Sequence, residues 1–86
     1  MPRVSEFFGI IIYMYFSEHS PAHFHAQYGD DEASFRIDTL ELLEGKLPRR
    51  VIALVLEWAS LHRAELRLDW EKARQGKQLD PITPLD

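Results

Sequence analysis

Residues 23–38 read HFHAQYGDDEASFRID, and apolar and polar side chains alternate in both halves of this segment. Alternation with a period of two is typical of a strand that buries one face. Gly29-Asp30-Asp31 lies between the two runs and has the chemistry of a hairpin turn. We therefore expect two antiparallel strands, over residues 23–28 and 32–38.

The alternation divides these strands into a core face and an open face. The core face holds Phe24, Ala26, Tyr28, Ala33, Phe35 and Ile37, and the open face holds His23, His25, Gln27, Ser34, Arg36 and Asp38. A loop at Asp30-Asp31 would place His25 opposite Arg36, whereas a loop at Gly29-Asp30 would place His23 opposite Arg36. In both registers the polar side chains share one face.

The flanking segments complete the expected fold. Residues 9–17 are rich in Ile, Tyr and Phe and predict a buried strand, and residues 39–44 predict a short helical turn closed by Gly45. Apolar residues then recur at helical spacing after Pro48, which predicts one long helix to about Gln75. The expected fold class is α+β, a three-stranded antiparallel meander packed on one long C-terminal helix (β-β-β-α). Residues 1–86 should form a single domain.

Composition excludes several classes of protein. The formal net charge of -4 argues against a protein that grips nucleic acid by bulk electrostatics. The chain has no cysteine, so it has no disulfide or thiolate chemistry, which fits a cytoplasmic protein. Its longest apolar run, residues 7–16, is about half the length of a transmembrane helix, so we expect no membrane span. A core this small would gain stability from a homodimer or another partner.

Three of the four histidines, His19, His23 and His25, lie within seven residues. Imidazole titrates near neutrality, so we predict His23 and His25 as acid–base groups, with Asp38 orienting a ring. The predicted binding residues are Arg36 for a phosphate, Tyr13 and Tyr15 for stacking, and Gln27 on the same face. Such a set would suffice for metal-independent, ribonuclease-like cleavage, in which the 2′-hydroxyl of RNA is the nucleophile.

Two other functions fit the same residues. His19, His23 and His25 could instead supply three nitrogen ligands to zinc with an open position for water, although no cofactor is favoured. The histidine face could also be a non-catalytic interface in a protein interaction module. His62 lies among apolar positions of the predicted helix, and we expect it to be a structural histidine.

Several strings in the chain together resemble one family. They are FFGIIIYMYF (residues 7–16), the histidine pattern with Pro21, Tyr28-Gly29, residues 42–48, residues 56–59 and WEKARQGK (residues 70–77). The resemblance is to small bacterial proteins that contain the domain of unknown function 4160, and it covers nearly the whole chain. It implies one half of a toxin–antitoxin-like gene pair whose partner is a neighbour-encoded small protein. The leading hypothesis is thus a component of such a pair that binds or cleaves RNA.

Overall fold

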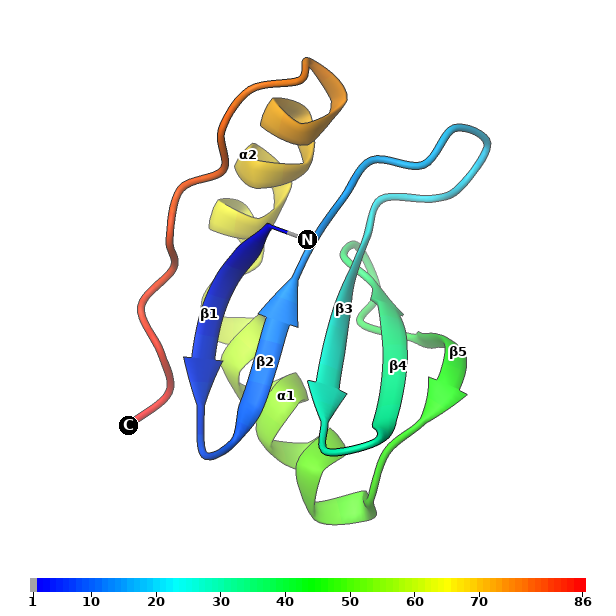
Figure 1. Cartoon of the computed structure of the whole chain (residues 1–86), viewed down its shortest axis with the longest axis vertical. Helices are drawn as coiled ribbons and strands as arrows, with labels where there is room; N and C mark the ends of the chain where they lie inside the picture. The colour runs from blue at the N-terminus through cyan, green and yellow to red at the C-terminus, as the bar shows by residue number, and fades with distance from the viewer. Residues whose placement is uncertain (1) are drawn as a thin grey trace.

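A computed structural model describes residues 2–86 of the chain (Figure 1). Its elements are β1 (Arg3–Phe7), β2 (Ile10–Tyr13), β3 (His23–Tyr28), β4 (Asp31–Arg36), β5 (Leu42–Lys46), α1 (Arg49–Leu61) and α2 (Arg63–Arg74). The strands form one antiparallel sheet in sequential order. α1 crosses one face of this sheet, and α2 extends past the end at which the β2–β3 connection lies (Figure 1). Among residues 2–86, no helix covers the other face (Figure 1).

The prediction of a three-stranded meander on one long helix is wrong, because the sheet has five strands and the helical region is divided. The first missed strand is β1. Phe8 and Gly9 both adopt left-handed backbone angles (φ 51° and 79°), so they form the hairpin turn between β1 and β2 rather than the start of a strand. β1 is short and has an irregular register between Arg3 and Ser5, which removes the alternation that would reveal it.

The second missed strand is β5, in place of the short helical turn expected over residues 39–44. Gly45 has a φ of +83°, and a Cβ placed on it would lie 2.1 Å from the carbonyl oxygen of Glu32 in β4. The glycine is therefore needed where β5 passes closely against β4. A glycine that ends a helix and one that permits such an approach look alike in the sequence.

The expected single helix is interrupted at His62. The φ of −125° at this residue is not helical, and the His62 N–H donates to the carbonyl of Ala59, only three residues earlier. Its ring Nδ1 lies 2.6 Å from a carboxylate oxygen of Glu65, so His62 has a structural partner. The predicted end of the helical region is confirmed, since α2 finishes at Arg74 and Gly76 has a φ of +71°. No helix among residues 2–86 is long and apolar enough to cross a bilayer.

The core confirms the predicted division of β3 and β4 into two faces. Phe24, Ala26, Ala33, Phe35 and Ile37 are all buried among the apolar side chains of α1. Trp58 of α1 is the largest fully buried side chain and contacts Phe24 at a ring distance of 6.0 Å. Of the two registers considered, the structure has the loop at Gly29-Asp30, which places His23 opposite Arg36.

The C-terminal residues 77–86 run beside β1 (Figure 1). The Ile82 N–H donates to the Val4 carbonyl at 2.7 Å, and the indole N–H of Trp58 donates to the Thr83 carbonyl at 2.8 Å. Asp69, only 1% exposed, accepts a hydrogen bond from the Asp80 N–H, and its burial raises the pKa of its carboxyl group. Asp69 stands among the apolar positions of α2 because its carboxyl group holds residues 77–86 in place.

We predict that Gly45→Ala destabilises the protein by about 3 kcal/mol or more, since the new methyl group overlaps the β4 backbone and the left-handed conformation becomes strained. Urea denaturation would measure the change. Gly29→Ala is the matched control: it also has a positive φ (+59°), but no atom lies within 4 Å of the added Cβ. A loss of stability at position 45 no larger than at position 29 would contradict the close approach of β5 to β4.

Candidate functional site

The open face of the sheet carries a row of directly paired residues from four strands. Tyr13 of β2 lies opposite His25 of β3, His25 lies opposite Ser34 of β4, and Ser34 lies opposite Glu44 of β5. Direct partners in a sheet have side chains on the same face. The register therefore brings an aromatic ring, an imidazole, a hydroxyl and a carboxylate into one line across the sheet.

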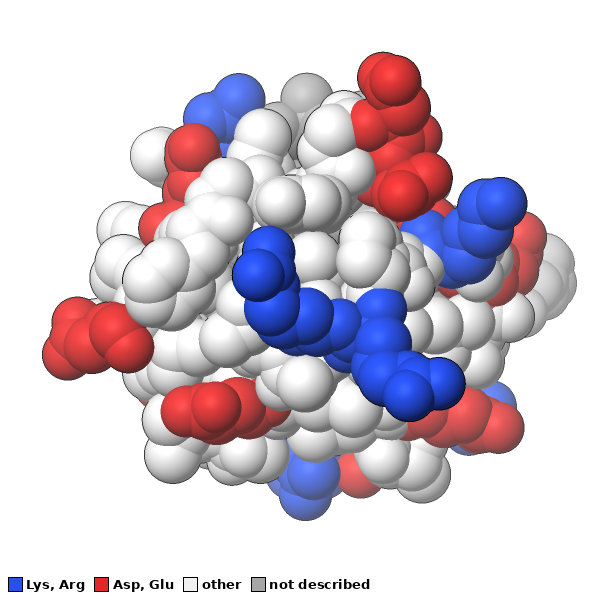
Figure 2. Space-filling view, turned by 90° about the horizontal axis from the view of Figure 1, so that it is seen from below, with Lys and Arg blue, Asp and Glu red and all other residues white. Residues whose placement is uncertain are grey.

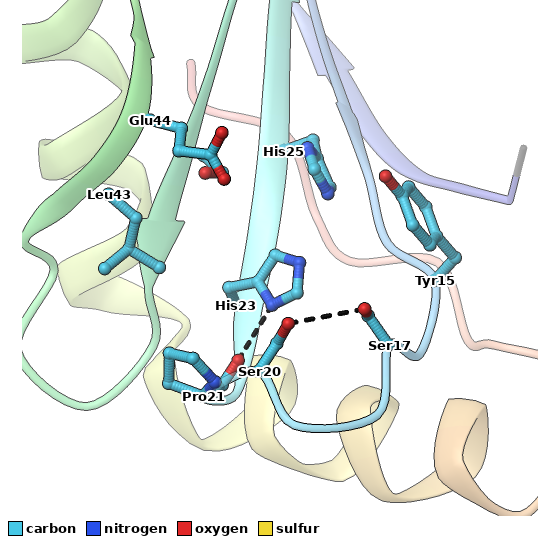
Figure 3. A pocket seen from close by; sticks show the side chains of 9 residues that line it. Tyr15, Ser17, Ser20, Pro21, His23, His25, Leu43 and Glu44 are labelled. Atoms are coloured by element: carbon cyan, nitrogen blue, oxygen red, sulfur yellow. Dashed lines mark hydrogen bonds between the residues drawn. The ribbon is translucent and has the colours of Figure 1, made fainter.

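Two adjoining hollows of about 330 and 280 Å³ lie over this row. Both are lined by Tyr15, His25, Ser34 and Glu44, so we treat them as one surface and name it the histidine groove. The remaining lining residues are Ser17, Ser20, Pro21, His23, Leu43, Glu32, Ala33 and Gly45. Figure 3 shows His23 and His25 pointing into the groove from β3, with Tyr15 and Glu44 on opposite sides.

His23 is held by a backbone contact that determines its tautomer. Its side chain is buried (6% residue exposure), and Nδ1 lies 2.8 Å from the carbonyl oxygen of Pro21. Because a carbonyl only accepts, Nδ1 must carry the proton that is donated. In the neutral ring, Nε2 is then the unprotonated nitrogen, on the side of the ring that points toward His25 (Figure 3). Trp70 of α2 packs on this imidazole at a ring distance of 5.2 Å.

His25 lies at the centre of the groove without hydrogen bonds. Its ring is stacked on Tyr13 and Tyr15 at centroid distances of 4.9 and 4.8 Å. Both ring nitrogens are buried and neither has a hydrogen-bond partner among residues 2–86. Burial, and then the charge of protonated His23, lower the pKa of His25, against the opposing effect of Glu32 and Glu44. At neutral pH, His25 therefore carries one N–H donor and one acceptor, and both lack a partner.

The electrostatics of the groove are acidic. Glu32 places a carboxylate oxygen 3.8 Å from His25 Nδ1, and Glu44 contributes a second carboxylate to the lining. Burial and then Glu32 raise the pKa of the Tyr13 phenol, so that Tyr13 remains neutral. No Lys or Arg of residues 2–86 lines either hollow. The arrangement favours a ligand that donates hydrogen bonds or carries positive charge.

Several predicted site residues lie elsewhere. Asp38 does not orient a histidine: it follows the end of β4, and its carboxylate pairs with Arg67 of α2 at 3.1 Å. Arg36 lies opposite His23 in the sheet but outside the groove lining, and its Nε is 3.9 Å from a carboxylate oxygen of Glu41. Gln27 lines a separate hollow of about 180 Å³. The structure thus brings together His23, His25, Tyr13 and Tyr15, without the phosphate contact.

The histidines also do not assemble the alternative zinc site. His19 lies in the exposed β2–β3 connection, and its ring nitrogen has only Glu18 nearby, at 3.8 Å. Among residues 2–86, no three His, Cys, Asp or Glu side chains are grouped so that they could hold a metal ion. The described residues therefore offer no built site for a metal cofactor.

Glu44 and Glu32 are the site residues that sequence reasoning missed. Glu32 is the first residue of the predicted second strand, and the alternation places it on the face that holds His25, although it was not among the predicted site residues. Glu44 belongs to β5, which was expected to be a helical turn, so it could not be placed on the sheet. The pattern Leu42-Leu43-Glu44-Gly45-Lys46 offered no alternation that would have identified the strand.

Comparison with known proteins adds a family and no activity. The family described as Domain of unknown function (DUF4160) matches residues 9–71, a range that includes every residue of the histidine groove. No curated protein and no solved structure matches the chain.

We predict that His25 titrates below the ordinary histidine pKa of 6.5. Because the folded state binds this proton less readily than the unfolded state, the contribution of His25 to stability is complete above the unfolded pKa. It is lost progressively as the pH falls from the unfolded pKa through the lower pKa of the folded state. NMR titration of the ring protons and thermal unfolding between pH 8 and pH 5 would measure both effects.

Glu44→Gln should lower the His25 pKa further, because it removes a carboxylate that favours the protonated ring. Glu57→Gln, at an exposed position of α1, is the control. A His25 that titrates at or above 6.5 would show that its ring is more hydrated than the structure indicates.

Proposed function

The chain belongs to the family described as Domain of unknown function (DUF4160), which assigns no activity, and we propose from the histidine groove that it is a non-catalytic recognition module. In this proposal the groove binds a positively charged side chain of a partner protein. A neighbour-encoded small protein, as in a toxin–antitoxin-like pair, is the partner we favour.

The observation that carries the proposal is the charge of the groove. Glu32 and Glu44 lie on the rim beside neutral His25, and no Lys or Arg of residues 2–86 lines the groove, although Lys46 is the direct partner of Glu32 in the neighbouring strand. Two unit charges roughly 4 Å apart near a protein surface interact by about 4 kcal/mol before desolvation is subtracted. A guanidinium or ammonium group that enters the groove would gain this attraction, whereas a phosphate would be repelled.

The uncharged groups of the groove suit the same ligand. A guanidinium can donate to the hydroxyl of Ser34, and to the unprotonated nitrogen of His25 when the side chains that cover this ring move aside. The face of Tyr15, which is partly exposed, can add a cation–π contact of about 0.5–2 kcal/mol. The His25 contact would satisfy ring nitrogens that now lack a partner, which favours binding over an empty groove.

The rim of the groove resembles a protein interface rather than an enclosed small-molecule site. Tyr15 and Leu43 are large side chains in the lining, and Tyr15 remains 41% exposed. Aromatic residues are enriched at the centres of protein interfaces, and exposed apolar side chains around an open groove provide area for a macromolecular partner. A protein side chain, presented with its neighbouring residues, would cover the charged groove and its apolar rim together.

RNA cleavage is the second candidate, and it is supported by one observation. His23 donates through Nδ1 to Pro21, which leaves Nε2 available to remove a proton from a 2′-hydroxyl. Two features count against it: Arg36 lies outside the groove near Glu41, and Glu32 and Glu44 face the position that a phosphate would occupy. Testing the protein with an arginine probe and with an oligoribonucleotide distinguishes the two functions.

We predict that the groove binds Nα-acetyl-arginine amide and that Glu44→Gln or Glu32→Gln weakens this binding about tenfold, the loss expected for one charged hydrogen bond. NMR shifts of the His25 ring would report binding at the site. Glu57→Gln should leave the affinity unchanged.

An oligoribonucleotide should neither shift the His25 resonances nor be cleaved. If it is cleaved, and if His23→Ala abolishes that cleavage in a folded protein while a 2′-deoxy oligonucleotide stays intact, the catalytic function is correct and the recognition proposal is wrong. Absence of binding by the arginine probe would also reject the proposal.

A further inference from the structure

We propose that the chain has a second docking surface, at the opposite end of the sheet from the β2–β3 connection, for an acidic segment of another protein that inserts an apolar side chain. This surface, which we name the Phe8 surface, consists of Phe8, Tyr28, Arg50, Val51 and Leu54 around a hollow of about 360 Å³. It is independent of the histidine groove, because the two share no lining residue.

The backbone at Phe8 is the first observation. Phe8 is 58% exposed and has a φ of +51°, in a turn where the neighbouring Gly9 also has a positive φ. Such turns favour Asn or Gly at the first position, and an aromatic residue is strained there. Phe8 is therefore unfavourable in two ways, in its conformation and in its exposure. Neither is explained by the core, and strain of this kind is often retained for function.

The charges beside the hollow are the second observation. α1 begins with Arg49 and Arg50, it has no acidic residue in its first turn, and no side chain caps it. Cations at this end of a helix oppose the helix dipole, so helix stability does not account for them. Among residues 2–86, no acidic group lies within ion-pair distance of Arg49 or Arg50.

The location of these groups joins the two observations. The β1–β2 turn, the end of β3 and the start of α1 all lie at the same end of the molecule (Figure 1). Figure 2 views this end directly and shows Lys and Arg side chains in an arc across its middle, with most Asp and Glu side chains toward the periphery. In a chain with a net charge of -4, this is a local positive surface beside an apolar hollow.

The charge complementarity identifies the class of partner. An apolar side chain of the partner would fill the hollow between Phe8, Tyr28 and Leu54, while its carboxylates reached the arginines of α1. A nucleic acid fits less well, because its closely spaced phosphates would also pass the acidic residues at the periphery, including those of the β3–β4 turn. The two surfaces of the module therefore select opposite charges.

The Phe8 surface can be tested by photo-cross-linking in cells, with p-benzoylphenylalanine at position 8. The expected adduct is a protein, and sequencing of the cross-linked peptide should show several Asp or Glu residues around an aliphatic or aromatic residue. An adduct with RNA, with lipid or with a second copy of this chain would overturn the proposal, as would the absence of any adduct.

The captured segment would then be synthesised and its affinity for the purified, full-length chain measured. Arg50→Glu should lower this affinity at least tenfold, whereas Lys77→Glu, the same change of charge at an exposed position beyond α2, should leave it unchanged. If both variants lower the affinity equally, binding depends only on the net charge of the chain, and the assignment of this surface is overturned.

Phe8→Asn separates a binding role of Phe8 from a structural one, because the two roles predict opposite changes in the unfolding temperature. Asparagine tolerates the left-handed turn, so the variant should unfold at a higher temperature and yet bind the segment at least tenfold more weakly. Arg50→Glu should likewise gain stability from the helix dipole while losing affinity. If Phe8→Asn lowers the unfolding temperature, or if it leaves the affinity unchanged, Phe8 is not the anchor of a docking surface.

Discussion

The register between β3 and β4 is the constraint on which the rest of the structure depends. With the loop at Gly29-Asp30, His25 lies opposite Ser34, and every second residue of both strands packs beneath α1. A slip of β4 by one residue relative to β3 would turn Phe35 toward water while Phe24 stayed in the core. The core therefore fixes which face of each strand is buried, and the period of β3 places the two imidazoles side by side on the open face. The groove is a consequence of how the core is buried.

The two surfaces of the chain illustrate different ways in which function opposes stability. In the histidine groove, His25 is buried with both nitrogens unpaired, which is unfavourable until a ligand supplies a partner. At the Phe8 surface, an exposed aromatic residue occupies a left-handed turn and two arginines begin a helix. Each feature lowers the stability of the isolated chain, and each is explained if the missing interactions come from a partner. A module with two oppositely charged surfaces could hold two segments of one protein or bridge two proteins.

The division of the hairpin into two faces could be predicted from residues 23–38, as could the end of the helical region at Gly76. Three other features could not. β1 has a register irregularity that hides its alternation, and Gly45 has the same local signal as a helix end although it serves a close strand contact. The alternation along β4 would place Asp38 on the open face, yet the strand ends before this residue, and its carboxylate pairs with Arg67 of α2.

The sequence by itself determined which side chains of β3 and β4 share a face, because the period of a strand follows from local backbone geometry. Only the tertiary structure decided which groups complete that face. Glu44 reaches the groove through β5, Arg67 removes Asp38 from it, and the Pro21 carbonyl sets the tautomer of His23. These contacts join segments whose pairing depends on the packing of the whole chain. Local pattern therefore located the histidines, whereas the charge around them followed from the fold.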